Sequence, residues 1–489
     1  MAPVSEEQLN SIVSKVLGRL QPDARGAAPA NAYAAQQAGE GIFPTLDDAL
    51  KAVERAQYTL EWERSMSDRQ KYIDAIRAVM MQNLENLARL AVEETQMGRV
   101  EHKIIKNRLV TLKSPGTEDL TAIAWTGDHG MTLYEYAPWG IIGAIAPTTN
   151  PSETIICNSI GMIAAGNGVC FAPHPRAKRT SQLAISLINR AVVSAGGPPN
   201  LVTCVAEPSI EVASALMKHP LVRLLVVTGG PGVVKAAMAS GKKVIAAGPG
   251  NPPSVCDETA DLEKAGRDMV NGASLDNNII CSDEKEFIAV ASIADKLKDA
   301  MKRNGAFEID ADQTERLMKA ILAVNKGPGG NSDVNTKFVG KNANVLLREI
   351  GINAGDEVKL VLCEVNRNHT LLYTEQLMPV LPFVRVRDFE EGLELAVQVE
   401  HGYGHTSSIH SRYVDRMHRM ARVMDTAIFV KNGSHYMGLG EGGEGPTSFS
   451  IAHPTGEGLT YARHFARMRR CALVDAFNIT SGPARPVSF

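Results

Sequence analysis

The hydrophobic positions follow two periods along the chain, and their alternation predicts an α/β fold. Five short apolar runs have the length and the β-branched content of buried strands: Gly140–Ala146, Val169–Ala172, Leu201–Ala206, Val222–Thr228 and Val244–Ala247. Segments with helical periodicity separate them, most clearly Ser152–Ala165 and Ala177–Ala195. Strands that alternate with helices in this way predict a parallel sheet with both faces covered.

A second alternating series follows Asp261 and predicts a second lobe. Its strands are expected near four positions: Phe287, Leu360, Val380 and Ile428. We therefore predict two α/β lobes with parallel sheets, at residues 43–253 and 254–445, followed by a C-terminal segment at 446–489.

The N-terminal part of the chain, up to residue 112, contains two segments of helical periodicity separated by a segment without it. Residues 43–112 belong to the first lobe, with Trp62–Leu90 as their longest helical run. Residues 1–20 predict a separate amphipathic helix, because six apolar side chains share one face: Leu9, Ile12, Val13, Val16, Leu17 and Leu20. Residues 21–42, rich in Ala, Gly, Pro and Gln, predict a flexible linker. The helix either folds back onto its own domain or an oligomer neighbour, or docks into a groove of another protein.

Composition and charge narrow the function classes. The chain has 489 residues, 44% hydrophobic and 21% charged, as is typical of a globular protein. Its formal net charge of −3 provides no basic excess, so we expect neither a nucleic-acid nor a membrane partner. Seven scattered cysteines without a C-x-x-C pair predict free thiols in a reducing compartment. Without a secretory signal or an apolar run near the ~20 residues that span a bilayer, we expect a cytoplasmic protein.

Two glycine-rich turns follow predicted strands. Thr228-Gly229-Gly230-Pro231-Gly232 leads from a strand into a helix, where bare backbone and a helix N-terminus suit a phosphate. A tight strand-to-helix turn explains the same residues, and both interpretations stay open. The other turn, Ala246–Gly250, contains no carboxylate that could activate a water molecule.

Cys281 is the cysteine best suited to act as a nucleophile. The polar loop Asp276-Asn277-Asn278 precedes it, whereas the other six cysteines are interpreted as packing residues. A reactive thiolate needs partial exposure and nearby hydrogen-bond donors, and a polar loop supplies both.

Two further polar positions lie at predicted strand ends. Asn150, which follows Pro147-Thr148-Thr149, either aims its amide at a developing oxyanion or caps the next helix. His174, close to Arg176, either faces a ligand phosphate or belongs to a turn. His401 and His405 have an i, i+4 spacing, but two intervening glycines and the lack of a third ligand disfavour zinc, so we predict no metal site.

In this order, the segments resemble the CoA-acylating branch of the aldehyde dehydrogenase superfamily. Five sequence motifs account for the resemblance: Ala146–Pro151, Phe171–Ala177, Gly248–Asn251, Asp276–Cys281 and Thr374–Pro379. The front end resembles that of the propionaldehyde dehydrogenases packaged in bacterial microcompartments, where such a helix is an encapsulation peptide.

The resemblance implies an architecture and an assembly. Residues 43–253 would form a Rossmann-like NAD-binding lobe and residues 254–445 the catalytic lobe. Oligomerisation strands at about 126–138 and the segment 446–489 would build a homodimer or homotetramer. Residues 1–20 would bind a shell or core protein in the microcompartment lumen.

The resemblance also implies roles for individual residues. Cys281 would be the nucleophile, and the Asn150 amide would hold the oxyanion. Glu375 would hold the nicotinamide ribose and His174 would lie near the cofactor. The other cofactor contacts would come from Pro147, Thr148, Thr228, Gly229, Gly232 and Gly248.

The implied reaction converts propionaldehyde or acetaldehyde, CoA and NAD+ reversibly to acyl-CoA and NADH. Hydrolytic relatives carry a glutamate in the segment that matches Ala246–Gly250, and its absence here favours transfer to coenzyme A. Two alternatives stay open: an inactive scaffold protein on a dehydrogenase fold, and a hydrolytic enzyme that releases the free acid.

Overall fold

A computed structural model describes residues 40–479. The predicted helix at residues 1–20 lies outside the described residues, as does most of the predicted linker. The last three linker residues are part of the body, since Ile42 begins strand β1 (Ile42–Phe43) and the Gly41 backbone N–H donates to Asn200 Oδ1 at 3.1 Å.

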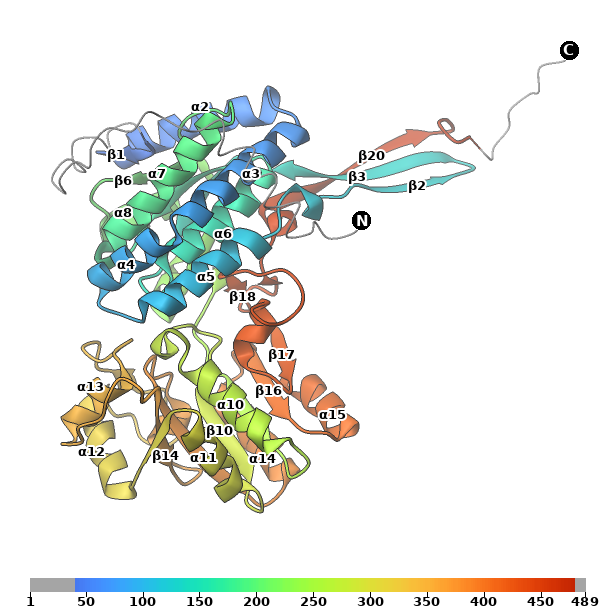
Figure 1. Ribbon diagram of the computed structural model, residues 1–489. Coiled ribbons are helices and arrows are strands. Elements are labelled where there is room, and N and C mark those ends of the chain that lie inside the picture. The colour runs from blue at the N-terminus through green and yellow to red at the C-terminus, as the bar shows by residue number, and fades with distance from the viewer. Residues whose placement is uncertain (1–39, 480–489) are drawn as a thin grey trace, which may run out of the picture.

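The first lobe is built on a parallel sheet, as predicted, and β1 adds a sixth strand to the five expected ones (Figure 1). Its strand order is β1-β6-β5-β4-β7-β8. The five strands after β1 match the predicted runs to within two residues at either end: β4 (Ile141–Ile145), β5 (Gly168–Ala172), β6 (Val202–Val205), β7 (Val222–Thr228) and β8 (Lys243–Ala247). All are paired in parallel, so their carboxyl ends meet at one edge of the sheet.

Helices cover both faces of this sheet. One apolar core joins the sheet to three helices, α2 (Leu46–Trp62), α8 (Ile210–Lys218) and α9 (Pro231–Met238). The other face packs against α6 (Pro151–Ala164) and α7 (Lys178–Ser194), which are backed by α3 (Met66–Gln82), α4 (Leu84–Thr95) and α5 (Val100–Lys113).

The run of helical periodicity at Trp62–Leu90 is divided among three helices, because the chain breaks it twice. Ser65 caps α3 in a capping box with Asp68, which starts a new helix three residues after α2 ends. Asn83 separates α3 from α4. Helical periodicity continues across both breaks, so it did not reveal them.

The second lobe carries a seven-stranded parallel sheet in the order β11-β14-β15-β10-β9-β16-β17. The four predicted strands are present as β10 (Glu286–Val290), β14 (Leu360–Glu364), β15 (Val380–Val386) and β17 (Ile428–Lys431). Three strands were not predicted: β9 (Pro253–Cys256), β11 (Ala306–Ile309) and β16 (Thr406–His410). The helices of this lobe are α10 (Leu262–Ala273), α11 (Ala294–Arg303), α12 (Ala311–Ile321), α13 (Ala343–Glu349), α14 (Phe389–Glu400) and α15 (Val414–Met424).

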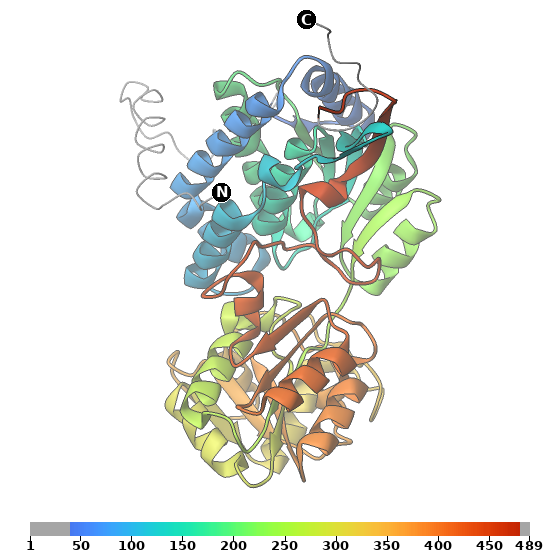
Figure 2. The same ribbon diagram turned by 90° about the vertical axis from the view of Figure 1, so that its right-hand side faces the viewer.

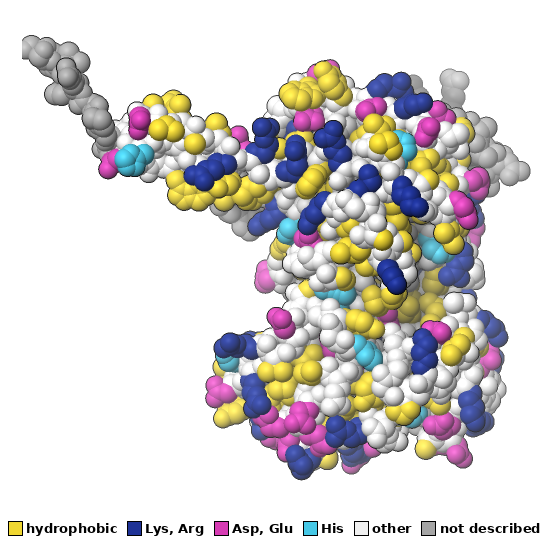
Figure 3. Space-filling view, turned by 180° about the vertical axis from the view of Figure 1, so that it is seen from behind, with side chains coloured by type: hydrophobic (Ala, Val, Ile, Leu, Met, Phe, Trp, Pro, Cys, Tyr) yellow, Lys and Arg dark blue, Asp and Glu magenta, His cyan; other side chains and the backbone are white. Residues whose placement is uncertain are grey.

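An antiparallel arm projects from the first lobe (Figures 1 and 2). It consists of β2 (Ile123–Gly127), β3 (Gly130–Pro138) and β20 (Ala466–Val474), so the C-terminal segment returns from the second lobe to the first. Seen from behind, the arm carries hydrophobic side chains on its surface (Figure 3). The exposed ones are Ile123, Trp125, Met468, Leu473 and Val474.

Between residues 40 and 479, the helices are too short or too polar to cross a membrane.

Candidate active site

A cavity of about 410 Å³ lies where the carboxyl ends of β4, β7 and β8 meet the second lobe. It brings together nine of the ten residues named from the sequence: Pro147, Thr148, Asn150, His174, Thr228, Gly229, Gly248, Cys281 and Glu375. Gly232 does not line it, because it lies inside the first turn of α9. These residues come from both lobes, which makes the interlobe cavity the candidate active site.

The turn before Cys281 has an unusual backbone. Asp276, Asn277 and Asn278 adopt left-handed conformations with φ of 46°, 57° and 64°, and all three are buried. Asp and Asn tolerate this region better than other non-glycine residues, because their short polar side chains bond locally. Asn278 Nδ2 donates to the carbonyls of Ala273 and Glu284, each at 2.8 Å. The polar loop seen in the sequence is therefore a fixed turn that aims Cys281 at the cavity.

Cys281 is half-buried, unlike the five fully buried cysteines of the two lobes. Burial raises the pKa of the Cys281 thiol to about 12, and the nearby Glu375 adds to the shift while Lys285 opposes it. The interpretation of all six other cysteines as packing residues is wrong for Cys471, which is exposed on β20.

Asn150 occupies the N-cap position of α6 but makes no side-chain capping bond. Its Oδ1 accepts a hydrogen bond from Lys106 Nζ at 2.6 Å, and its Nδ2 donates to Thr149 Oγ1 at 3.2 Å. The capping alternative is therefore not realised, and the amide group of Asn150 belongs to the cavity wall.

A buried ion-pair cluster supports this wall, and the sequence analysis missed it. Lys106 Nζ lies 2.5 Å from Asp276 Oδ2 and 3.0 Å from Glu153 Oε1, while Lys103 Nζ lies 2.9 Å from the same Asp276 oxygen. Burial alone would raise the pKa of Asp276, but Lys103 and Lys106 outweigh it and lower the pKa to about 2. A signal was available, since Lys103 and Lys106 are spaced i, i+3 on a helix and so share one face.

The glycine turn between β7 and α9 is open. Gly229 and Gly230 line the cavity, and α9 begins at the next residue, Pro231. A Cβ atom added at Gly230 or Gly232 would meet no heavy atom within 4 Å. Bare backbone beside the N-terminus of a helix can approach a phosphate group closely, so this turn fits the pyrophosphate of a dinucleotide.

His174 is a turn residue and a cavity residue at once. Its Nδ1 accepts the backbone N–H of Arg176 at 3.1 Å and caps a short 3-10 helix. Burial, and then Arg176, lower the pKa of His174, so the ring is neutral near pH 7. With Nδ1 accepting, the ring proton lies on Nε2, which is then a donor available to a ligand.

The turn after β8 is tightly packed. A Cβ atom at Gly248 would lie 3.0 Å from Pro454 Cγ, and one at Gly250 would lie 2.8 Å from the Cys281 carbonyl oxygen. Among the described residues that line the cavity, Glu375 is the one carboxylate. Burial raises the pKa of Glu375 to about 7, which Lys285 and the Gly250 backbone N–H only partly offset.

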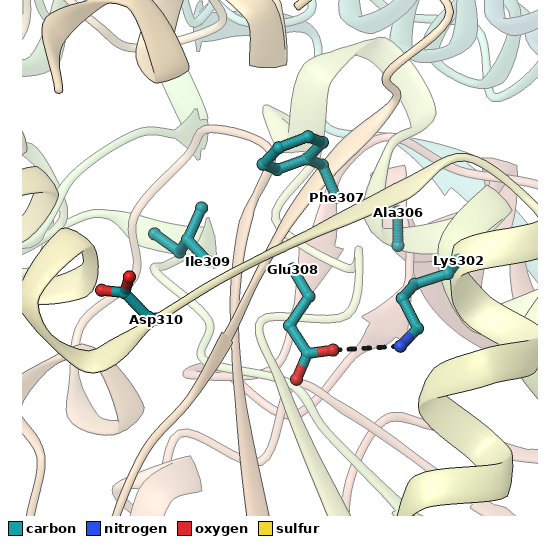
Figure 4. Close-up of a pocket in the computed structure, with 6 residues that line it drawn as sticks. All are labelled: Lys302, Ala306, Phe307, Glu308, Ile309 and Asp310. Carbon is teal, nitrogen blue, oxygen red and sulfur yellow. Dashed lines mark hydrogen bonds and ion pairs between the residues drawn. The ribbon is translucent and has the colours of Figure 1, made fainter. Parts of the chain in front are cut away.

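A second hollow, of about 560 Å³, lies along the edge strand β11 (Figure 4). Two of its charged side chains pair with each other, Lys302 with Glu308 at 3.2 Å, and the third, Asp310, caps α12. None of the candidate residues lines it, so the interlobe cavity remains the candidate site.

Comparisons with known proteins agree with this geometry. The model of the aldehyde dehydrogenase family matches residues 29–450. The acetylating acetaldehyde dehydrogenase EutE of Salmonella typhimurium is 48% identical over 477 residues, which cover 97% of this chain and 100% of that protein. The CoA-propanoylating propanal dehydrogenase of the same organism is 46% identical, over 91% of this chain and 94% of its own.

A solved structure is similar to this chain in both fold and sequence. Propionaldehyde dehydrogenase of Rhodopseudomonas palustris, crystallised with bound CoA and an acylated cysteine, superimposes with a TM-score of 0.87 and 52% identity. The alignment covers 90% of this chain and 99% of that one. The expected fold class and family resemblance are thereby confirmed.

Proposed function

Since the chain belongs to the aldehyde dehydrogenase family, we infer that it catalyses the CoA-acylating reaction of that family. A short-chain aldehyde, CoA and NAD+ are converted to acyl-CoA, NADH and a proton. The observation that carries this function is the interlobe cavity, which unites Cys281, Asn150 and an open glycine turn.

Cys281 and Asn150 divide the chemistry between them. The Cys281 thiol gives up its proton, which is the proton released overall, and its sulfur adds to the aldehyde carbon while the carbonyl electron pair moves onto oxygen. The Asn150 amide and the Cys281 backbone N–H donate to this oxyanion. Bound NAD+ would supply the acceptor for the hydride that leaves the former aldehyde carbon, and Cys281 would then carry a thioester.

The thioester passes to CoA because the segment after β8 lacks the carboxylate that activates water in hydrolytic relatives. Ala246–Gly250 contains no carboxylate, and its packing leaves little room for a larger side chain. The thiol of CoA is a better nucleophile than neutral water, and the exchange of one thioester for another is nearly balanced in free energy. The reaction is therefore reversible.

Residues that line the same cavity provide the contacts for the cofactor. Gly229 and Gly230 offer bare backbone to the pyrophosphate, and Thr228 and Gly232 flank them. The proton on His174 Nε2 and the Glu375 carboxyl are suited to the two ribose rings. Pro147, Thr148 and Gly248 complete the pocket.

Assembly and location belong to the same proposal. The arm formed by β2, β3 and β20 exposes apolar side chains, and a partner subunit in a homodimer or homotetramer would cover them. A solved relative comes from the fucose-utilisation microcompartment of Clostridium phytofermentans and is 46% identical. By analogy the enzyme works in a microcompartment lumen, with residues 1–20 docked on a shell or core protein.

A product assay tests the reaction. Wild-type protein is mixed with propionaldehyde and NAD+, with and without CoA, and NADH and acyl-CoA are measured. We expect sustained NADH formation only with CoA, and loss of at least about 10⁴-fold in Cys281→Ala. Cys471→Ser is the matched control, because it removes the one exposed thiol and leaves the cavity intact.

The alternatives give different results in the same assay. Free acid formed at an unchanged rate without CoA would assign a hydrolytic enzyme. No NADH with any short-chain aldehyde, from folded protein that binds NAD+, would assign an inactive scaffold.

A further inference from the structure

Lys106 joins the two parts of the proposed oxyanion site. It lies on α5 and is 1% exposed at its side chain. Its ammonium donates to Asn150 Oδ1 at 2.6 Å and pairs with Asp276 Oδ2 at 2.5 Å. Asn150 is the N-cap residue of α6 in the first lobe, whereas Asp276 opens the turn that leads to Cys281 in the second. In Figure 1, α5 lies on the side of the first lobe that faces the second.

The contact decides which end of the Asn150 amide faces the cavity. An ammonium group has three donors and no acceptor, so it can bond only the carbonyl oxygen of an amide. A flipped Asn150 would bring its NH₂ group against Lys106 Nζ, leaving a buried charge without that partner. The flipped amide would also present an acceptor where the reaction needs a donor.

The neighbouring Lys103 shows what a purely structural lysine does here. It is equally buried and pairs with the same Asp276 oxygen at 2.9 Å. Its other contact is the backbone carbonyl of Thr149 at 3.3 Å, and it makes no bond to the Asn150 side chain. The two lysines share a helix, a charge and a partner, whereas Lys106 alone contacts the Asn150 side chain and also pairs with Glu153 at 3.0 Å.

We propose that Lys106 is the positioning residue of the oxyanion site: it fixes the Asn150 amide with Nδ2 toward the cavity and ties it to the turn that carries Cys281. Lys106 touches no reacting atom and acts through Asn150. The proposal rests on the proposed function, since it needs an oxyanion to form in the cavity.

The test separates acylation from thiol reactivity. All variants are made in the Cys471→Ser background. NADH released in a single turnover without CoA reports acylation, which forms an oxyanion. The rate of Cys281 alkylation by iodoacetamide reports the thiol alone. We expect Lys106→Met to slow acylation about 10- to 100-fold, against about 10²–10³-fold for Asn150→Ala, while alkylation changes less than about threefold.

Two comparisons make the result specific to Asn150. Lys103→Met should slow acylation much less than Lys106→Met. In the double variant with Asn150→Ala, the loss caused by Lys106→Met should shrink to less than about threefold, because the amide it orients is gone. Lys106→Gln keeps a donor to Asn150 and should recover part of the lost rate, and it replaces Lys106→Met if that variant does not fold.

The opposite pattern overturns the inference. If Lys103→Met and Lys106→Met lose acylation equally, or if the Lys106 effect persists unchanged beside Asn150→Ala, Lys106 serves only the stability of the cluster. Failure of the proposed function looks different, because wild-type protein would then give no NADH burst at all.

Discussion

The two walls of the cavity are built in opposite ways. The wall with the β7–α9 turn is bare, and a side chain added at Gly230 or Gly232 would meet open space. The wall with Cys281 is crowded. Its turn of three left-handed residues is held by buried ion pairs and by hydrogen bonds from the side-chain amide of Asn278. Even the nearby Gly98 is confined, since a Cβ atom there would lie 2.0 Å from Asp276 Oδ1.

The difference matches what each wall has to do. Reacting atoms must be held within a fraction of an ångström, which requires side chains locked by their neighbours. A phosphate-binding turn needs only backbone N–H groups and room. We therefore expect substitutions in the crowded wall to lower folding stability strongly, and substitutions in the open wall to be tolerated without a large loss of stability.

The largest effect should come from the centre of the crowded wall. Asp276→Asn keeps the size of the side chain but removes the negative charge that Lys103 and Lys106 share. Removing one partner of a buried ion pair leaves uncompensated charge, so the free energy of unfolding should fall by about 3–5 kcal/mol. Equilibrium urea unfolding at fixed protein concentration measures the change.

Asp295→Asn is the matched control for that change. Asp295 also pairs with an arginine, Arg385, but its side chain is 77% exposed. A solvent-exposed pair contributes little, so this variant should lie within about 1 kcal/mol of the wild type. Equal losses in the two variants would mean that the buried cluster does not hold the Cys281 turn.

The open wall was largely predictable from the sequence, and the reason is geometric. Parallel strands rich in Val and Ile, such as β7 (Val222–Thr228), are buried on both faces and stand out as apolar runs. Their carboxyl ends converge at one edge, so motifs that follow them, at His174 and Gly229, had to lie close together.

The crowded wall was not predictable in the same way. Asp276 and Lys106 are far apart in the sequence, and no local pattern indicates that they pair. Strand β16 was missed for a similar reason, since a polar residue in it finds its partner on a distant strand: Ser408 donates to Ser254 Oγ at 2.8 Å. Buried polar groups whose partners come from distant segments look like surface residues in a sequence.

An intermediate effect is expected at Glu375, and it should depend on pH. Burial raises the pKa of Glu375 from the usual 4.5 to about 7, so ionisation is costly in the folded state. Between these values the folded chain keeps a proton that the unfolded chain has lost, and the wild type loses stability as pH rises. Glu375→Gln escapes this cost, so its advantage should be absent at pH 4, grow toward pH 7 and level off at about 3 kcal/mol above it.

Urea unfolding of both proteins at pH 4, 5.5, 7 and 8 measures the difference. Other buried carboxyls titrate in both proteins and cancel in the comparison. A difference that is constant with pH would show that Glu375 is not held protonated by burial.

The smallest effects are expected in the open wall, where Gly230 and Gly232 form a matched pair. Gly230 lines the cavity and Gly232 does not, although a Cβ atom at either would be unobstructed. Gly230→Ala should therefore weaken NAD+ binding by about 5- to 10-fold, roughly 1 kcal/mol, by keeping the phosphate away from the backbone. Gly232→Ala should change affinity less than about twofold and stabilise α9 by about 0.5–1 kcal/mol, because alanine favours a helix over glycine. Calorimetric titration with NAD+ and thermal unfolding measure both quantities.

An equal loss of affinity in the two variants would mean that the phosphate site extends into α9, as the family resemblance implied for Gly232. A large loss of stability in either variant would contradict the openness of this wall.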